Sequence, residues 1–135
     1  MQIYDRVWFH DGSHQTPTIF YFNTTLICRD PHTKAPIGEW CYQVKYFEED
    51  MLKSDDLIAQ TEYVCTEDIA VKFVIDGFQS GDWASWNYDI YSQITHTCNF
   101  ESVKKSRERP FSKIPVDGRT VYTLHHTVEL YESGT

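Results

Sequence analysis

The sequence lacks the local motifs that mark most enzymes. It contains no HExxH pair, no phosphate-binding glycine loop and no nucleophile elbow. No apolar run is long enough to span a membrane. The first residues, MQIYDRVWFHDG, have neither a basic segment nor an apolar core, so they do not predict a signal peptide. These absences leave catalysis open but favour a non-catalytic protein in the cytoplasm of the producing cell or of an infected host.

Cysteine is sparse, and its spacing gives no metal or redox motif. The four cysteines are Cys28, Cys41, Cys65 and Cys98, and none forms CxxC. An even number would allow two disulfides in a secreted protein. Because the sequence shows no export signal, we expect reduced, buried thiols. Asn23-Thr24-Thr25 is an acceptor triplet for N-glycosylation, which would have no consequence in the cytoplasm.

Basic residues are outnumbered, and the imbalance is uneven along the chain. The whole sequence has 12 Lys and Arg against 20 Asp and Glu, a net charge of −8. Residues 1–99 hold 6 basic and 15 acidic side chains, a net −9, whereas residues 100–119 hold 6 and 3, a net +3. An acidic body repels a nucleic-acid backbone and attracts a basic partner. The charge therefore favours a protein partner with a basic surface.

Residues 66–80, TEDIAVKFVIDGFQS, predict the one helix of the chain. Thr66 is a good N-cap, and Glu67 and Asp68 place negative charge in the first turn. Asp68 and Lys72 are spaced for an i,i+4 ion pair on a narrow polar stripe. The many β-branched residues of this stretch would also suit a buried strand. We favour the helix because the cap, the acidic first turn and the stripe agree.

The rest of the chain predicts strands and one long connection. Alternating side chains favour strands at 2–10, 18–29, 39–47, 57–65, 86–98 and 119–131. Residues 99–118 contain two prolines and read as a long basic loop that is mobile or functional; it becomes a hairpin tip if the last two strands pair. The prediction is one α+β domain over residues 1–135. A curved, mainly antiparallel sheet of about six strands packs on one central helix in the order ββββαββ.

An acidic segment next to two tryptophans is the first candidate site. Acidic runs are usually solvated loops, but tryptophan is enriched at binding hot spots. Reversing the charge of the acids should slow association with a basic partner. The candidate partner-binding residues are Glu48, Glu49, Asp50, Asp55, Asp56, Trp83 and Trp86.

An aromatic pocket between sheet and helix is the alternative site. Aromatic pockets with few polar groups are typical of ligand sites. A histidine on an apolar strand face is more often a satisfied core residue than a general base. The candidate lining is Trp40, Tyr42, Trp86, Tyr88 and Tyr122, with His96 and His126 as polar groups.

Two further groups carry weak signals. The basic residues of 104–113 could touch phosphate or an acidic partner, but no aromatic interleaving supports nucleic-acid binding. They are Lys104, Lys105, Arg107, Arg109 and Lys113. His10, Asp11 and His14 with His32 match no metal spacing, so we predict no metal and no cofactor.

The resulting functional prediction is a small acidic cytosolic protein that docks on another macromolecule and inhibits or regulates it. Toxin immunity proteins and phage inhibitors of host defence share this size and charge, which is an analogy of class only. The alternative is a small-molecule-binding protein or small enzyme that uses the aromatic pocket. Homo-oligomerisation through sheet edges or the aromatic surface stays open.

Overall fold

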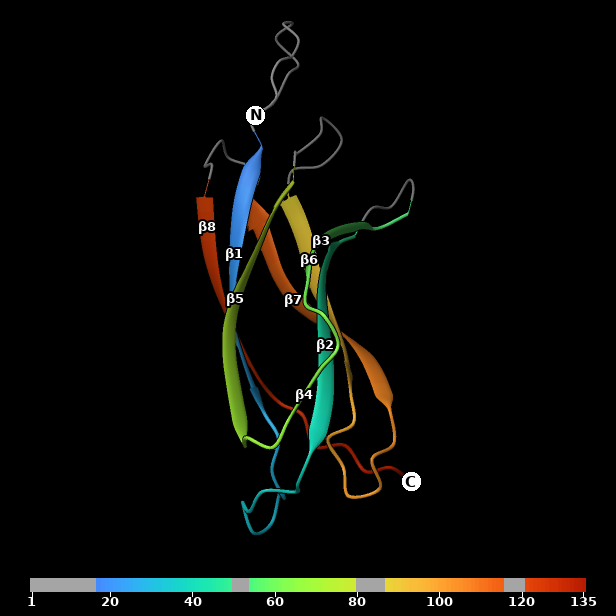
Figure 1. Ribbon diagram of the computed structural model, residues 1–135. Helices are drawn as coiled ribbons and strands as arrows, with labels where there is room; N and C mark the ends of the chain where they lie inside the picture. The colour runs from blue at the N-terminus through green and yellow to red at the C-terminus, as the bar shows by residue number, and fades with distance from the viewer. Residues whose placement is uncertain (1–16, 50–53, 80–86, 116–120) are drawn as a thin grey trace, which may run out of the picture.

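The fold is a sandwich of two β-sheets. In the computed structural model, which describes residues 17–49, 54–79, 87–115 and 121–135, eight strands form two layers (Figure 1). These residues contain no helix, and so none that could cross a membrane. The predicted α+β fold with a helix over 66–80 is therefore wrong.

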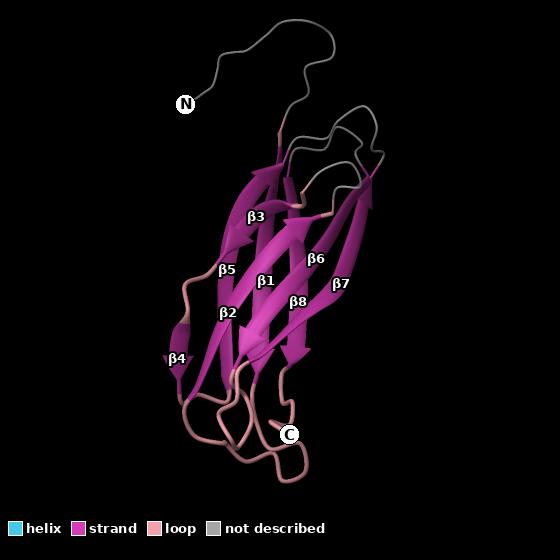
Figure 2. Ribbon diagram, turned by 90° about the vertical axis from the view of Figure 1, so that its right-hand side faces the viewer, coloured by secondary structure: helices cyan, strands magenta, loops and turns pink. Residues whose placement is uncertain are grey.

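Three of the strands form one sheet and five form the other. They are β1 (Thr18–Ile27), β2 (Trp40–Glu48), β3 (Asp56–Gln60), β4 (Val64–Thr66), β5 (Ala70–Gln79), β6 (Asn87–His96), β7 (Lys105–Pro115) and β8 (Val121–Glu129). The three-stranded sheet has the order β5-β1-β8, and β1 and β8 run parallel. The larger sheet has the order β3-β2-β6-β7, with β4 also paired to β2. Figure 2 shows the larger sheet lying across the three-stranded one.

The predicted helix is strand β5 and the turn before it. Side chains along β5 alternate between exposed and half-buried, which is the period of a strand. The polar stripe does not distinguish a helix from a strand. A spacing of four places Asp68, Lys72 and Asp76 on one face of either element. The Thr66 hydroxyl accepts from the backbone N–H of Asp68 at 3.1 Å, which closes a turn instead of capping a helix. The β-branched residues decide the outcome in favour of the strand.

Most of the predicted strands are confirmed, but the long connection predicted between the last two is not. Four of them, 18–29, 39–47, 86–98 and 119–131, correspond to β1, β2, β6 and β8, and 57–65 divides into β3 and β4. The strand predicted at 2–10 lies outside the described residues. β6 pairs with β2 and β7, so it does not form a hairpin with β8.

The predicted basic loop 99–118 contains β7. Two prolines argued against a strand here. β7 is an edge strand of the larger sheet, where a residue without an N–H is tolerated. Pro110 pairs with Tyr91 and Ile90 with Ser112, so Phe111 is an extra residue in a β-bulge. Pro115 ends the strand.

The core fills the space between the facing sheets. The Phe22 ring of β1 stacks on the Tyr46 ring of β2 with centroids 3.9 Å apart, which joins the two layers at the centre. Rings and branched aliphatic side chains complete the interior. Its fully or nearly fully buried members include Phe20, Phe22, Leu26, Trp40, Val44, Tyr46, Tyr88, Ile90, Ile94 and Leu130.

All four cysteines form disulfides, so the prediction of reduced thiols is wrong. Cys28 follows β1 and Cys98 follows β6; their bond joins the two sheets, and both residues are buried. Cys41 and Cys65 face each other across β2 and β4, with Cα atoms 3.9 Å apart. Disulfides are typical of oxidising compartments. The cytoplasmic location stays a prediction, and this observation speaks against it.

At Gly77, strand β5 lies close against the backbone of β3 in the other sheet. A Cβ at this position would lie 2.0 Å from the backbone oxygen of Ile58 in β3. We expect Gly77→Ala to lower the free energy of unfolding by about 1–3 kcal/mol, because the strands must move apart. Asp76→Ala is the matched control on the exposed face and should change it by less than about 0.5 kcal/mol. Urea denaturation of both variants measures the difference, and equal losses would contradict the contact between β5 and β3.

Candidate functional site

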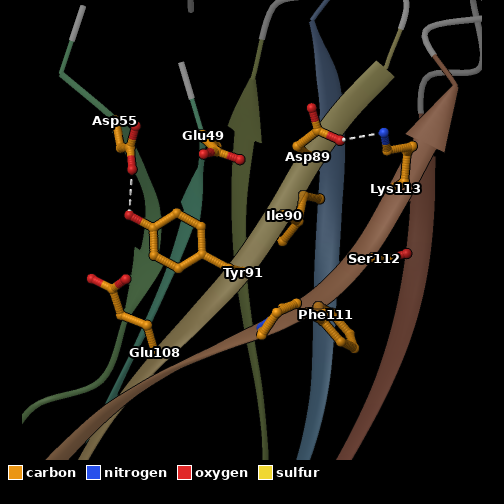
Figure 3. Close-up of a pocket in the computed structure, with 10 residues that line it drawn as sticks. Glu49, Asp55, Asp89, Ile90, Tyr91, Glu108, Phe111, Ser112 and Lys113 are labelled. Carbon is orange, nitrogen blue, oxygen red and sulfur yellow. Dashed lines mark hydrogen bonds and ion pairs between the residues drawn. The ribbon is translucent and has the colours of Figure 1, made fainter. Parts of the chain in front are cut away.

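An acidic pocket of about 740 Å³ lies on the outer face of the larger sheet (Figure 3). Asp89 and Tyr91 of β6 alternate with the buried Tyr88, Ile90 and Ser92, so they point away from the core. The residues that line the pocket are Glu49, Asp55, Asp89, Ile90, Tyr91, Glu108, Pro110, Phe111, Ser112 and Lys113. The volume lies within the range of about 300–1,000 Å³ that is usual for ligand sites.

The β-bulge between β6 and β7 shapes this pocket. Phe111, the extra residue, turns its ring inward, where it contacts the rings of Phe22, Tyr46 and His126. Pro110 takes the place opposite Tyr91 on the outer face. Bulges re-aim side chains and are common beside functional sites. Here the bulge produces a break in the sheet surface around Tyr91.

Negative charge dominates the pocket. Four carboxylates, those of Glu49, Asp55, Asp89 and Glu108, face one ammonium group, that of Lys113, which leaves a formal excess of three negative charges. The Lys113 Nζ lies 3.4 Å from Asp89 Oδ1. Among the described residues, the Glu49 and Glu108 carboxylates have no hydrogen-bond or ion-pair partner. These two groups are therefore available to a ligand.

Tyr91 lies among three of these carboxylates, those of Glu49, Asp55 and Glu108. Its hydroxyl donates a hydrogen bond to Asp55 Oδ2 at 2.5 Å, and its ring stacks on Phe47 with centroids 5.3 Å apart. Desolvation, then the hydrogen bond to Asp55 and the nearby negative charges, raise the pKa of Tyr91 far above its usual value. The phenol therefore stays protonated and neutral, and it holds Asp55 in place.

A second pair of carboxylates next to the pocket has a structural role. The amide Nε2 of Gln79 donates to Glu48 Oε1 at 2.5 Å and to Asp56 Oδ2 at 2.7 Å. Gln79 ends β5 in the three-stranded sheet, whereas Glu48 and Asp56 pair across β2 and β3 in the larger one. This amide therefore ties the two sheets together at the pocket end.

The structure divides the predicted acidic site. Glu49 and Asp55 line the pocket, and Glu48 and Asp56 bind Gln79. Asp50, Trp83 and Trp86 lie outside the described residues. Sequence reasoning missed the contribution of Asp89, Tyr91 and Glu108 to the site. The alternation of β6 placed Asp89 on a polar face, but only its pairing with β2 and β7 brings it to the acidic segment.

The predicted aromatic pocket corresponds to the interior between the sheets. Trp40, Tyr42 and Tyr88 are buried, and Tyr122 is half-buried. Two of them make internal hydrogen bonds: Trp40 Nε1 donates to Asp68 O at 2.8 Å, and the Tyr88 hydroxyl lies 3.0 Å from Thr18 Oγ1. None of these residues lines the pocket on the outer face.

His96 is a satisfied core histidine. Its Nδ1 accepts from the backbone N–H of Cys98 at 2.9 Å, so Nε2 carries the proton and donates to Glu132 Oε1 at 3.2 Å. Burial lowers its pKa, and Glu132 only partly offsets this effect. Although desolvation acts in the opposite direction, hydrogen bonds from Arg107 and His96 lower the pKa of Glu132. His96 therefore fastens the C-terminal segment to the larger sheet.

His126 belongs to a second internal network. Its Nδ1 lies 3.1 Å from the Tyr46 hydroxyl, which lies 2.8 Å from Thr24 Oγ1. Burial raises the pKa of Tyr46 to about 12 and lowers that of His126, and the Arg109 charge lowers the latter further. Both groups are therefore neutral at pH 7 and act as hydrogen-bonding members of the core.

The basic residues of 104–113 have different surroundings. Lys113 pairs with Asp89, and Arg107 pairs with Glu132. Arg109 is half-buried, and its Nε has no hydrogen-bond partner among the described residues. Lys104 lies over the Tyr63 ring, 4.8 Å from its centroid. Lys105 lies opposite His96 in the register of β7 and β6.

No metal-binding group of three or more ligands occurs within the described ranges. The backbone N–H of His32 donates to Asp30 in the turn after β1. His10, Asp11 and His14 lie outside those ranges, so the possible metal set of the N-terminal segment is not described.

Comparison with known families assigns the chain to a family. A family model described as Caenorhabditis elegans protein of unknown function (DUF870) matches residues 24–135. The match covers most of the chain, so the protein belongs to this family. It includes every pocket residue and all strands except the first part of β1. No curated protein matches the sequence.

The buried His96 and the half-buried His126 predict how stability depends on pH. Their folded-state pKa values lie below the usual 6.5, so the unfolded chain binds more protons as the pH falls. Their contribution to stability is therefore present above about pH 6.5 and is lost as the pH falls through the lower folded-state values. We expect the free energy of unfolding to fall between about pH 7.5 and pH 5.

The variant His126→Gln should reduce this pH slope, whatever it does to stability at neutral pH. His125→Gln changes the neighbouring exposed residue of β8 and should keep the slope of the natural protein. Denaturant titrations across the pH range measure both. An unchanged slope in His126→Gln would show that this ring does not stay neutral in the folded state.

Proposed function

We propose that this protein is a non-catalytic binding protein whose acidic pocket docks a lysine or arginine side chain of a basic protein partner. The observation that carries the proposal is the group of four carboxylates that lines the pocket, of which Glu49 and Glu108 have no partner among the described residues. The net charge of −9 over residues 1–99 supports the same choice of partner. The inhibitory or regulatory effect of docking stays a prediction.

The chemistry of the lining suits a basic side chain. Carboxylates accept the charge-assisted hydrogen bonds that a guanidinium or ammonium group donates. The Tyr91 ring and Pro110 offer apolar surface for the aliphatic stem. Aromatic faces also attract cations. Charge and apolar surface thus occur together on one side of the sheet.

The lining supports binding better than catalysis. The described pocket residues include no histidine and no cysteine. The two histidines of the earlier enzymatic alternative, His96 and His126, are engaged in core hydrogen bonds. That alternative also required a helix over the aromatic residues, and residues 70–79 form a strand instead. The pocket offers acceptors and negative charge, which are the requirements of docking.

Binding of a hexa-arginine peptide tests the proposal directly. We expect the double variant Glu49→Gln/Glu108→Gln to bind it on the order of tenfold more weakly, because two exposed carboxylates contribute about 1 kcal/mol or somewhat more together. The control is Glu62→Gln/Glu67→Gln, which removes two exposed carboxylates elsewhere and gives the same net charge. Isothermal titration calorimetry at about 50 and 300 mM salt measures both variants.

The control should bind as the natural protein does, apart from a small effect of overall charge. The pocket variant should also lose part of the salt dependence. Equal weakening in both variants would show that the peptide responds to net charge alone. Unchanged binding in the pocket variant would remove Glu49 and Glu108 from the account.

A further inference from the structure

The two disulfides make N-glycosylation of the asparagine triplet in β1 relevant. Both cysteine pairs are bonded, and one of the bonds is buried between the sheets. Bonds of this kind form in oxidising compartments such as the endoplasmic reticulum. N-glycosylation takes place in the same compartment and requires an Asn-X-Ser/Thr triplet. Asn23-Thr24-Thr25 is such a triplet.

The position of Asn23 in the fold is compatible with an attached sugar. β1 is the central strand of the three-stranded sheet, and Asn23 lies between the fully buried Phe22 and Thr24. Its side chain therefore points away from the core. Its neighbours across β5 and β8 are Val74 and His125, which are both exposed. The side-chain amide of Asn23 has no hydrogen-bond partner among the described residues.

We propose that Asn23 carries an N-linked glycan, added as the chain passes through the secretory pathway. Thr25 supplies the hydroxyl of the triplet and lies on the same outer face, between Lys72 and Thr127. Thr24 is buried and bonded to Tyr46, which is no obstacle because the oligosaccharide is attached before the chain folds. After folding, the sugar extends into solvent without disturbing the core.

The transfer requires a lipid-diphosphate-linked oligosaccharide and the cell's own transferase. The Nδ2 atom of Asn23 bonds to the anomeric carbon of the first sugar. The bond between that carbon and the diphosphate oxygen breaks, and the lipid diphosphate leaves with the electron pair. The amide nitrogen loses one proton, which passes to the solvent. No oxidation or reduction takes place in this step.

The glycan would shield the more apolar of the two outer faces. Ile19 pairs with Phe78 on one side and with Val121 on the other, and these three side chains are 37%, 68% and 46% exposed. Ile19 lies four residues before Asn23, a distance of roughly 13 Å along the strand. A hydrated sugar beside an exposed apolar row keeps that face in solvent. The acidic pocket on the opposite sheet is left uncovered.

Expression of the full chain behind an exogenous signal peptide in animal cells tests the proposal. We expect the secreted protein to carry one glycan, which peptide N-glycosidase removes while converting Asn23 to aspartate. Asn23→Gln and Thr25→Ala should both abolish the glycan, and Thr25→Ser should retain it. Asn87→Gln changes a strand asparagine that is followed by Tyr88-Asp89, so it should leave the glycan in place.

Mass spectrometry of tryptic peptides decides the outcome. A secreted, disulfide-bonded chain with unmodified Asn23 would overturn the proposal, as would a glycan that persists in both Asn23→Gln and Thr25→Ala. The same measurement on the protein from its natural cells should find residue 23 glycosylated, and an unmodified residue there would also overturn it. Peptide binding by the acidic pocket is independent of these results, so the two proposals fail separately.

Discussion

The covalent bond between Cys28 and Cys98 holds together two strands, β1 and β6, that belong to different sheets and do not pair with each other. Cys28 follows β1, the central strand of one sheet, and Cys98 follows β6 of the other, 70 residues later. A chain-entropy estimate gives such a link about 4 kcal/mol of stabilisation. At the opposite end, Gln79 bonds Glu48 and Asp56 across the same gap. With the sheets fixed at both ends, the ring stack of Phe22 on Tyr46 fills the middle.

This arrangement determines what each outer face presents. Because alternate residues of a strand point to opposite sides, burial of Tyr88, Ile90 and Ser92 places Asp89 and Tyr91 outside. In the same way, burial of Phe22 and Thr24 places Asn23 outside on the other sheet. One face therefore gathers carboxylates around a phenol, and the other carries a glycosylation triplet beside an apolar row. The two proposals assign these faces to different roles, partner binding and exposure to solvent.

The sequence predicted the strands that alternate cleanly and failed where two periods coincide. β2 and β6 show one apolar and one polar face, and both are where the pattern placed them. In residues 66–80, a spacing of four fits helix and strand alike, and the hydroxyl of Thr66 bonds a backbone N–H in either case. β7 escaped prediction because Pro110 and Pro115 argue against a central strand, whereas an edge strand accepts them.

The site could be predicted only in part, because its residues meet through distant pairings. Glu49 and Asp55 stood out as members of an acidic run. Asp89 and Glu108 join them only because β6 pairs with both β2 and β7, which no local pattern reveals. The cysteines were predicted to be reduced because the first residues show no export signal. That observation contains no information about contacts between β1 and β6. Cys28 and Cys98 become neighbours only in the assembled sandwich.

Peptide mapping of the unreduced protein by mass spectrometry is the most direct test of this account. The two-sheet arrangement predicts two linked peptide pairs, one joining Cys28 to Cys98 and one joining Cys41 to Cys65. That result would support both the packing that builds the pocket and the oxidising compartment that glycosylation needs. Four free thiols in the natural protein, or any other pairing, would contradict the packing of β1 against β6 and remove the basis for a secreted protein.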